Sequence, residues 1–396
     1  MRDYTTGLLL ALSCLTCSPP CISAEIPTDY SQQTKPATIK ILIADKADGA
    51  ILEVKGRYDI FNPHTQLPIT SSILGKRAAI YAHGEGVKWD DPFPYINQMR
   101  IVPSNPESSI LINGIEYRGC IEIYNLNGVI SIVNEVDIEN FLKSTLSVQL
   151  THVSDPKVLE ALAIVARTNA YYLASRNFQA QWHIRANETD YMGYGVTLQH
   201  LAIDRAIENT RHMVMTYKSQ PFAASWTENS AGRTANYCSI FRKQVVAPQG
   251  VPTPIASKDR EKHHWVAAFS KQEIAELAGL TKIVHVSPYL DQNSEKTYAV
   301  RISDGALTQD VDFFTLQKKL GKDRLRSNDF EVTIKGDKVL FSGWGQGHGV
   351  GLCLYSAKWM AAKGDSVAKI LSQFFPSTQL QNMRSFGQKN SNQAHE

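Results

Sequence analysis

A run of glycines at every second position restricts what the C-terminal part of this chain can fold into. Five glycines lie within residues 343–351, in the segment GWGQGHGVG. Because glycine lacks a Cβ atom, another backbone or a ligand can approach one face of such a segment very closely. A dinucleotide fingerprint needs another glycine spacing inside a βαβ unit, and a phosphate loop needs a lysine with a hydroxyl residue. The run therefore indicates a close-approach surface and argues against a nucleotide site.

His348 lies inside this glycine run. Its imidazole can serve as a general acid or base, or as a donor that positions a ligand. It can equally fix the loop through its own hydrogen bonds, as many lone histidines do. The sequence leaves both interpretations open.

The segment WTENSAGRT, residues 226–234, combines polar groups with a glycine-containing turn. It fits the wall of a cleft that binds a hydroxyl-rich ligand, with Trp226 stacking on a sugar ring. An ordinary turn whose hydroxyls cap the backbone has a similar sequence. The segment alone does not decide between these interpretations.

The composition is that of a packed globular protein. The chain of 396 residues is 43% hydrophobic and 20% charged, which excludes a disordered or fibrous protein. The formal net charge is only +3, so nothing argues for a nucleic-acid partner. No apolar run reaches the roughly 18 residues of a membrane span, and we expect no transmembrane span in the mature chain.

The first residues are typical of an export signal. An apolar stretch covers residues 7–15, and small residues lead to Ala24, an acceptable last residue before cleavage. We therefore expect an exported protein of the periplasm or cell envelope. Lipid attachment at Cys14 or Cys17 stays an open alternative.

No motif after residue 24 predicts a metal or a cofactor. This part of the chain lacks His-Glu-x-x-His, Cys-x-x-Cys and a nucleophile elbow. The adjacent His263 and His264 cannot easily face one metal ion. Cys120, Cys238 and Cys353 are widely spaced and are interpreted as core thiols. We expect neither a metal nor a cofactor.

The pattern along the chain predicts an α+β fold, with a small N-terminal β-rich domain and a mixed α/β main domain that forms a cleft. Asp137 is expected to cap a helix that carries Phe141 and reaches Gln149, and Asp155-Pro156 to start another helix. An Asn-Gly turn at residues 127–128 predicts a hairpin. The predicted parts are a signal peptide at 1–24, a linker at 25–37, the β-rich part at 38–133, the main domain at 134–380 and a polar tail at 381–396.

Further elements are expected in the C-terminal half of the chain. The stretch 251–264 is polar and is predicted to be a loop. The expected strands lie at 214–217, 221–226, 298–302, 330–334 and 339–341, and the expected helices at 201–210, 353–362 and 365–374.

These segments, in this order, resemble the stage II sporulation protein D family, also called the amidase-enhancer domain family. The resemblance extends from Ile39 to Thr378. It is carried by residues 117–120, 133–142, 161–168 (ALAIVART), 230–234 (SAGRT), 343–352 and 375–378 (FPST).

The resemblance implies action on peptidoglycan. Some members of the family are lytic transglycosylases that cut glycan strands stripped of stem peptides, and others bind the wall and stimulate a cell-wall amidase. The position of the family's catalytic glutamate is occupied here by Gln149, eight residues after Phe141. By the same resemblance, the residues expected to bind the substrate are Arg167, Trp226, Ser230, Gly232, Thr234, Trp344, Gly347 and Gly349.

With Gln149 at this position, the chain lacks the carboxylic acid that the family uses for the lytic reaction. A lytic cut needs a carboxylic acid to protonate the glycosidic oxygen, and an amide cannot transfer that proton. One hypothesis keeps the enzyme, with Glu228 as the acid, or else Asp137 or Glu139, and with His348 in the site. The other hypothesis is a wall-binding module that has lost catalysis and recruits or stimulates an amidase. Gln346 and Leu354 also depart from the family pattern, and the zinc ligands of some members are absent at 183–194.

Overall fold

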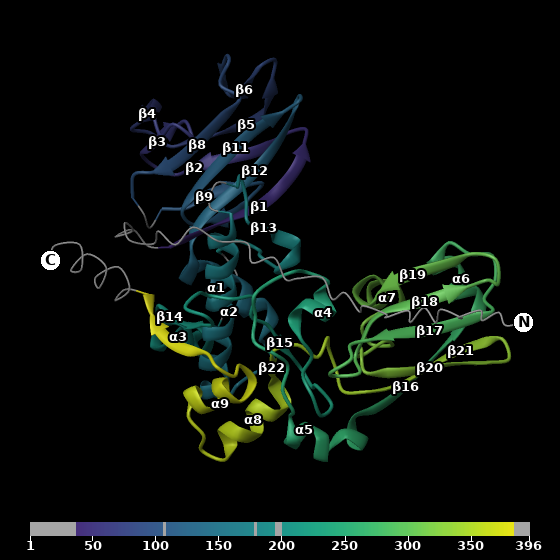
Figure 1. Ribbon diagram of the computed structural model, residues 1–396. Coiled ribbons are helices and arrows are strands. Elements are labelled where there is room, and N and C mark those ends of the chain that lie inside the picture. The colour runs from purple at the N-terminus through teal and green to yellow at the C-terminus, as the bar shows by residue number, and fades with distance from the viewer. Residues whose placement is uncertain (1–36, 106–107, 178–179, 195–199, 384–396) are drawn as a thin grey trace, which may run out of the picture.

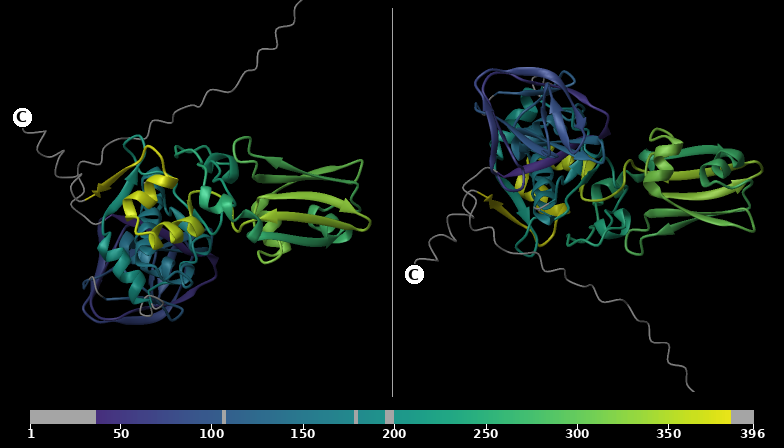
Figure 2. Two further views of the ribbon diagram at one scale, coloured as in Figure 1. Left: turned by 90° about the horizontal axis from the view of Figure 1, so that it is seen from below. Right: turned by 90° about the horizontal axis from the view of Figure 1, so that it is seen from above.

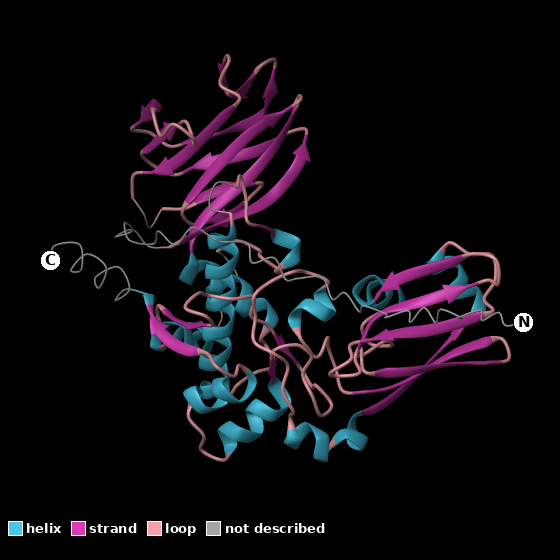
Figure 3. Ribbon diagram, in the orientation of Figure 1, coloured by secondary structure: helices cyan, strands magenta, loops and turns pink. Residues whose placement is uncertain are grey.

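The computed structural model describes residues 37–105, 108–177, 180–194 and 200–383. It shows a β-rich body, a helical body and a smaller mixed body that projects to one side (Figure 1). The same arrangement is seen from below and from above (Figure 2). Among the described residues, twelve strands come before the first helix, and the chain after them combines helices with further strands, so the fold class is α+β as expected (Figure 3).

The β-rich body consists of two antiparallel sheets. A seven-stranded sheet has the order β13-β1-β12-β11-β8-β3-β4, and a six-stranded sheet has the order β10-β9-β2-β5-β6-β7. Side chains alternate along each strand, so that Ile39 and Ile41 of β1 point to the core. The strands are β1 (Thr38–Ala47), β2 (Ala50–Val54), β3 (Tyr58–Phe61), β4 (Pro68–Ser72), β5 (Lys76–His83), β6 (Gly86–Trp89), β7 (Asp91–Phe93), β8 (Gln98–Pro103), β9 (Ile110–Ile112), β10 (Ile115–Tyr117), β11 (Cys120–Leu126), β12 (Val129–Asp137) and β13 (Ile184–Arg185).

The helical body lies directly below these sheets. Asp137 and Asp155 cap α1 and α2 by accepting backbone N–H bonds, as the sequence predicts. The helices are α1 (Ile138–Gln149), α2 (Pro156–Arg176), α3 (Leu201–Asn209), α4 (Tyr237–Phe241), α5 (Pro254–Lys258), α8 (Leu354–Ala362) and α9 (Val367–Phe374), with short 3₁₀ turns η1 (Ala186–Glu188) and η3 (Arg260–His263). Two short ribbons, β14 (Met213–Thr216) with β23 (Gln379–Asn382) and β15 (Trp226–Thr227) with β22 (Leu352–Cys353), tie distant segments together.

One continuous hydrophobic cluster joins the β-rich and helical bodies. It includes Ile39 and Ile123 from the sheets together with Leu142, Leu162 and Phe374 from the helices. The division expected near residue 133 therefore separates secondary-structure types and does not separate two hydrophobic cores.

The smaller mixed body has a core of its own. It is inserted between β15 and β22, and its core is built around Phe269, Phe313 and Phe341. The elements are β16 (His264–Ser270), α6 (Lys271–Ala278), β17 (His285–Leu290), β18 (Thr297–Ser303), β19 (Thr308–Asp312), α7 (Phe313–Leu320), β20 (Phe330–Lys335) and β21 (Lys338–Trp344). The predicted main domain, 134–380, thus contains an inserted body that the sequence patterns did not separate.

Buried polar contacts hold the inserted body to the helical body. The Lys296 ammonium, fully buried, donates to the Ser230 carbonyl and to the carboxylate of Asp329, each at 2.9 Å. Arg260 binds the same carboxylate with both terminal nitrogens. Because a buried lysine needs its partners in fixed positions, this network sets the orientation of the insert.

Several local expectations are corrected by the structure. The expected strand at 221–226 forms only at Trp226–Thr227, and the expected loop at 251–264 contains α5 and η3. Cys238 is exposed, whereas Cys120 and Cys353 are buried thiols. The predicted signal peptide and nearly all of the linker lie outside the described residues. The predicted polar tail begins inside β23, and the rest of it from residue 384 also lies outside them. None of the helices in the described residues is long and apolar enough to cross a membrane.

Candidate functional site

The glycine run packs against the segment that begins at Ser225. A Cβ atom at Gly347 would lie 2.5 Å from Oγ1 of Thr227, and one at Gly351 would overlap with the carbonyl oxygen of Ser225. The sequence left open whether another backbone or a ligand approaches this run. The structure shows that another segment of the chain does so. This corrects the expectation that a saccharide approaches the face, and Gly349 is likewise covered, by the Lys296 side chain.

The same packing fixes the position of Glu228. Asn229 and Gln346 exchange two backbone hydrogen bonds of 2.9 and 3.0 Å. The N–H of Tyr355, in the first turn of α8, donates to the carbonyl oxygen of Glu228 at 2.9 Å. Glu228 is therefore held between the glycine run and α8, with its side chain 33% exposed.

The Glu228 carboxylate is paired with a histidine that comes from the end of α1. Nε2 of His152 lies 2.9 Å from Oε1 of Glu228, and the His152 side chain is 48% exposed. Imidazole and carboxyl groups are the side chains that most often transfer protons in enzymes. The pair thus places two proton-carrying groups together on an accessible surface.

Gln149, the last residue of α1, precedes His152 by three residues and has partners of its own. Its Nε2 donates to the carbonyl oxygen of Thr189 at 3.1 Å and to Oδ2 of Asp190 at 3.4 Å. His152 lies in the turn after the helix. The two contacts at this end of α1, Gln149 with Asp190 and His152 with Glu228, are together called here the α1-end site.

His348 packs between aromatic side chains and bonds to its own loop. Its ring contacts Phe241 and Phe314, with centroids 5.1 and 6.2 Å apart, and its Nδ1 accepts the N–H of Val350 at 3.1 Å. Burial lowers the pKa of His348 to about 4, so that the imidazole is neutral near pH 7. We therefore assign His348 to the packing of the insert, in place of the expected place in the site.

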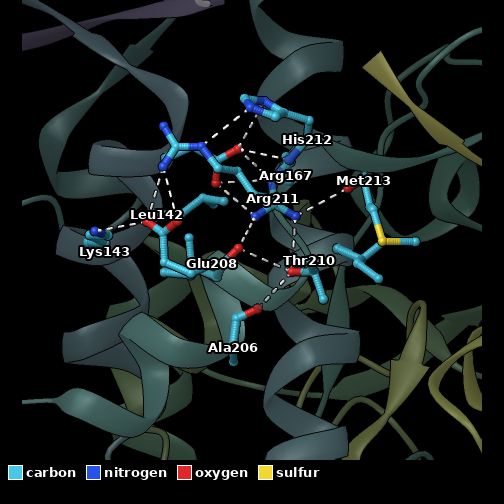
Figure 4. Close-up of polar contacts among 12 residues, drawn as sticks. Leu142, Lys143, Arg167, Ala206, Glu208, Thr210, Arg211, His212 and Met213 are labelled. Carbon is cyan, nitrogen blue, oxygen red and sulfur yellow. Dashed lines mark hydrogen bonds and ion pairs between the residues drawn. The ribbon is translucent and has the colours of Figure 1, made fainter. Parts of the chain in front are cut away.

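Arg167 lies inside the helical body, with its side chain fully buried. Its guanidinium binds the Glu139 carboxylate at 2.8 Å and donates to the carbonyl oxygens of Ile207 and Met213 (Figure 4). These partners leave it no surface toward a ligand. We therefore correct the expected glycan contact of Arg167 to a structural ion pair between α1 and α2.

Glu139 and Asp137 have structural roles. This corrects the expectation that either could be the catalytic acid in place of Glu228. Glu139 is the buried partner of Arg167. Asp137 caps α1 through the N–H groups of Glu139 and Asn140, and burial raises its pKa. Of the three carboxyls considered, Glu228 is the one that neither caps a helix nor is buried in an ion pair.

The expected contacts around residue 230 are largely internal. The Ser230 hydroxyl is 2.8 Å from Oγ1 of Thr253, and Thr234 bonds the backbone of Val251. Both side chains are buried, and a Cβ atom at Gly232 would contact Ser257 at 3.4 Å. These residues build a turn, which is the second of the interpretations left open for this segment.

The two tryptophans are only partly available. Trp226 is half-buried and packs against the main core. The Trp344 ring lies 4.4 Å from the Arg260 guanidinium, and its Nε1 donates to Glu261 at 3.1 Å. Both rings keep some exposed edge, so a role in sugar contact stays a prediction for each.

Part of the chain is similar in sequence to known proteins. The family described as Stage II sporulation protein matches residues 126–217. An uncharacterized protein of Chlamydia pneumoniae is 35% identical over 179 residues, 45% of this chain and 65% of that protein. Stage II sporulation protein D of Bacillus subtilis is 24% identical over 271 residues, 64% of this chain and 77% of that protein.

The amidase enhancer of Bacillus subtilis is 24% identical over 347 residues, 72% of this chain and 47% of that protein. Residues 126–217 therefore match the stage II sporulation protein family, and the relatives named Stage II sporulation protein D and amidase enhancer support this relationship. It spans just under two thirds of the length of the chlamydial relative.

The segment that matches the stage II sporulation protein D family contains Gln149 and His152 and ends before Glu228. No sequence pattern singled out His152 or Asp190 as members of the site. The one available signal was position, since His152 follows the family's glutamate position by three residues. Among the described residues, no group of three or more His, Cys, Asp or Glu side chains could hold a metal ion.

Proposed function

We propose that this protein binds peptidoglycan glycan strands stripped of stem peptides at the α1-end site, and cuts them as a lytic transglycosylase. The observation that carries the proposal is the 2.9 Å contact between His152 and Glu228. The contact supplies two proton-carrying groups, one of them three residues after the position where the family's glutamate is replaced by Gln149.

The chemistry needs one proton donor and one acceptor. The donor protonates the glycosidic oxygen as the bond from C1 to that oxygen breaks, and the C6 hydroxyl oxygen then closes on C1 while its proton is taken up. The imidazole and the carboxylate share one hydrogen bond, so a proton given to the sugar from the pair can be recovered by it from the C6 hydroxyl. In this scheme Gln149 orients the sugar through its amide.

The second candidate is a wall-binding module that recruits or stimulates a cell-wall amidase. The observation that favours it is the amide of Gln149, which donates to Thr189 and Asp190 and cannot act as an acid. The similarity to a protein named amidase enhancer supports such a partner. Both candidates place the chain in the cell envelope, consistent with the apolar stretch at residues 7–15.

A digest of purified glycan strands, with and without stem peptides, separates the two candidates. New anhydromuramyl ends on the denuded strands, lost in Glu228→Gln and in His152→Asn but kept in Glu85→Gln, support the enzyme. Glu85 is an exposed carboxylate in the β5–β6 hairpin and serves as the matched control. No anhydro ends, with wall pull-down retained, would favour the binding module.

A further inference from the structure

A cavity of about 540 Å³ opens where the inserted body meets the helical body. One wall is formed by α4 and the residues that follow it, and the other by the end of β17 and by β18. A volume of this size falls within the range of small-ligand sites, which often lie where two bodies meet. This space is called here the junction cavity.

The junction cavity is basic on one side. Arg242 and Lys243 line it, and both are exposed. Neither forms an ion pair with an acidic side chain within the described residues. The single carboxylate of the lining, Asp291, is buried, and its Oδ2 accepts from the N–H and hydroxyl of Ser294. The lining therefore has two cationic side chains against one buried carboxylate, and it is positive overall.

Arg242 occupies a backbone position that normally suits glycine. It ends α4 in the left-handed conformation, with φ of 53°. A non-glycine residue there costs about 1 kcal/mol, and such strain often marks positions whose side chain is used. The guanidinium lies 4.9 Å from the ring of Tyr298, which holds it over the cavity.

The remaining polar lining favours a hydroxylated ligand. Gln244, Gln292 and Asn293 each present an amide, which donates and accepts hydrogen bonds as sugar hydroxyls require. A phosphate ion is mainly a hydrogen-bond acceptor, so it uses the amide oxygens less fully than a sugar, whose several hydroxyls both donate and accept. Together the two cations and the amides fit a sugar that carries one carboxylate.

We propose that the junction cavity binds an acidic saccharide, with Arg242 and Lys243 holding its carboxylate. The identity of this ligand rests on the proposed function: it is the muramic acid unit of a denuded strand. Removal of the stem peptide converts the lactyl amide into a free carboxylate, so the cavity distinguishes denuded strands from strands that still carry stem peptides.

The test is a calorimetric titration of the full chain with N-acetylmuramic acid, N-acetylglucosamine and inorganic phosphate. The two sugars differ by the lactyl carboxylate, and only N-acetylmuramic acid is expected to saturate the site. Arg242→Gly and Lys243→Ala should each weaken its binding about tenfold, the value of one charge-assisted hydrogen bond. Lys55→Ala, an exposed lysine in the β-rich body, should leave binding unchanged.

Arg242→Gly keeps the test independent of misfolding, because glycine relieves the left-handed backbone while removing the guanidinium. Equal binding of both sugars, tighter binding of phosphate, no saturable binding of N-acetylmuramic acid, or unchanged binding in Arg242→Gly would each overturn the proposal. The two proposals can fail separately. N-acetylmuramic acid binding without strand cleavage would refute only the transglycosylase, and cleavage without N-acetylmuramic acid binding would refute only the junction site.

Discussion

The imidazole of His152 and the carboxylate of Glu228 form a 2.9 Å contact although 76 positions separate them in the sequence. His152 is delivered by the end of α1, and Glu228 by a segment locked between the glycine run and α8. The geometry of the pair therefore depends on the end of α1 and on the segment that carries Glu228. Either part can be altered by substitution while the other keeps its contacts.

Glu228→Gln should lower the rate of anhydro-end formation on denuded strands by about 10² to 10⁴, since that is the usual value of a positioned acid–base group. The substitution keeps the size of the side chain and its contact to His152. Chromatographic analysis of the muropeptides gives the rate, and pull-down on insoluble wall should remain as in the unchanged protein. A cleaving protein that is indifferent to this substitution would contradict the assignment of Glu228.

Gln149→Glu should create or raise cleavage, because it restores an acid of nearly the same shape. The new carboxyl would face the Thr189 carbonyl oxygen and the Asp190 carboxylate, which now accept the Gln149 amide. Both neighbours disfavour the charged form, so they should raise the pKa of the new group and keep it protonated toward neutral pH. A rate measured from pH 4 to 8 should fall on the alkaline side, and Gln149→Glu/Asp190→Asn should shift that fall to lower pH. A Gln149→Glu protein that binds strands but never cuts them would show that more than the acid is missing.

Arg167→Met should cost about 3–5 kcal/mol of unfolding free energy, because it leaves the Glu139 carboxylate buried without its partner. Replacing both residues by Met should be less damaging than replacing Arg167 alone, since no orphaned charge remains. Urea denaturation followed by circular dichroism measures both changes, with Arg57→Ala, an exposed arginine, as the control. If Arg167→Met instead kept full stability and lost strand binding, the structural assignment would be incorrect.

His348 should make the fold sensitive to acid. Its pKa is about 4 in the folded chain and 6.5 as the unperturbed value, so the unfolded chain binds more protons between these pH values. The contribution of neutral His348 to the free energy of unfolding is complete above about pH 6.5 and is lost as the pH falls toward 4. The whole loss is about 3 kcal/mol at most. In His348→Asn, whose amide oxygen can still accept the Val350 N–H, the slope of stability against pH in this window should flatten. An unchanged slope would place the acid sensitivity elsewhere.

Gly351→Ala should destabilise the chain by about 2–5 kcal/mol, combining overlap with the Ser225 carbonyl and a left-handed backbone. Gly336→Ala is the matched control, because its φ is also positive but no atom lies within 4 Å of an added Cβ. That control should cost only about 1–2 kcal/mol, for the backbone alone. Similar losses in the two variants, measured by thermal unfolding, would show that close packing of the glycine run is unimportant.

Features that depend on neighbouring residues in the chain could be predicted from the sequence. Asp137 and Asp155 cap helices because a carboxylate two residues before a free N–H can bond to it. Asn127 and Gly128 both adopt positive φ in the hairpin, as their residue types allow. The strand β16 and the helices α6 and α7 were missed, because they are short and are stabilised by packing within the insert.

The sequence by itself indicated that other atoms pack very closely against the glycine run, because a residue without a Cβ atom leaves room for such an approach. Only the tertiary structure decided that this partner is the backbone of residues 225–229, that Arg167 is buried with Glu139, and that His152 reaches Glu228. These contacts join residues 28 to 126 positions apart. These contacts form only when whole helices and strands pack together. Periodicity and capping patterns in the sequence do not predict that packing.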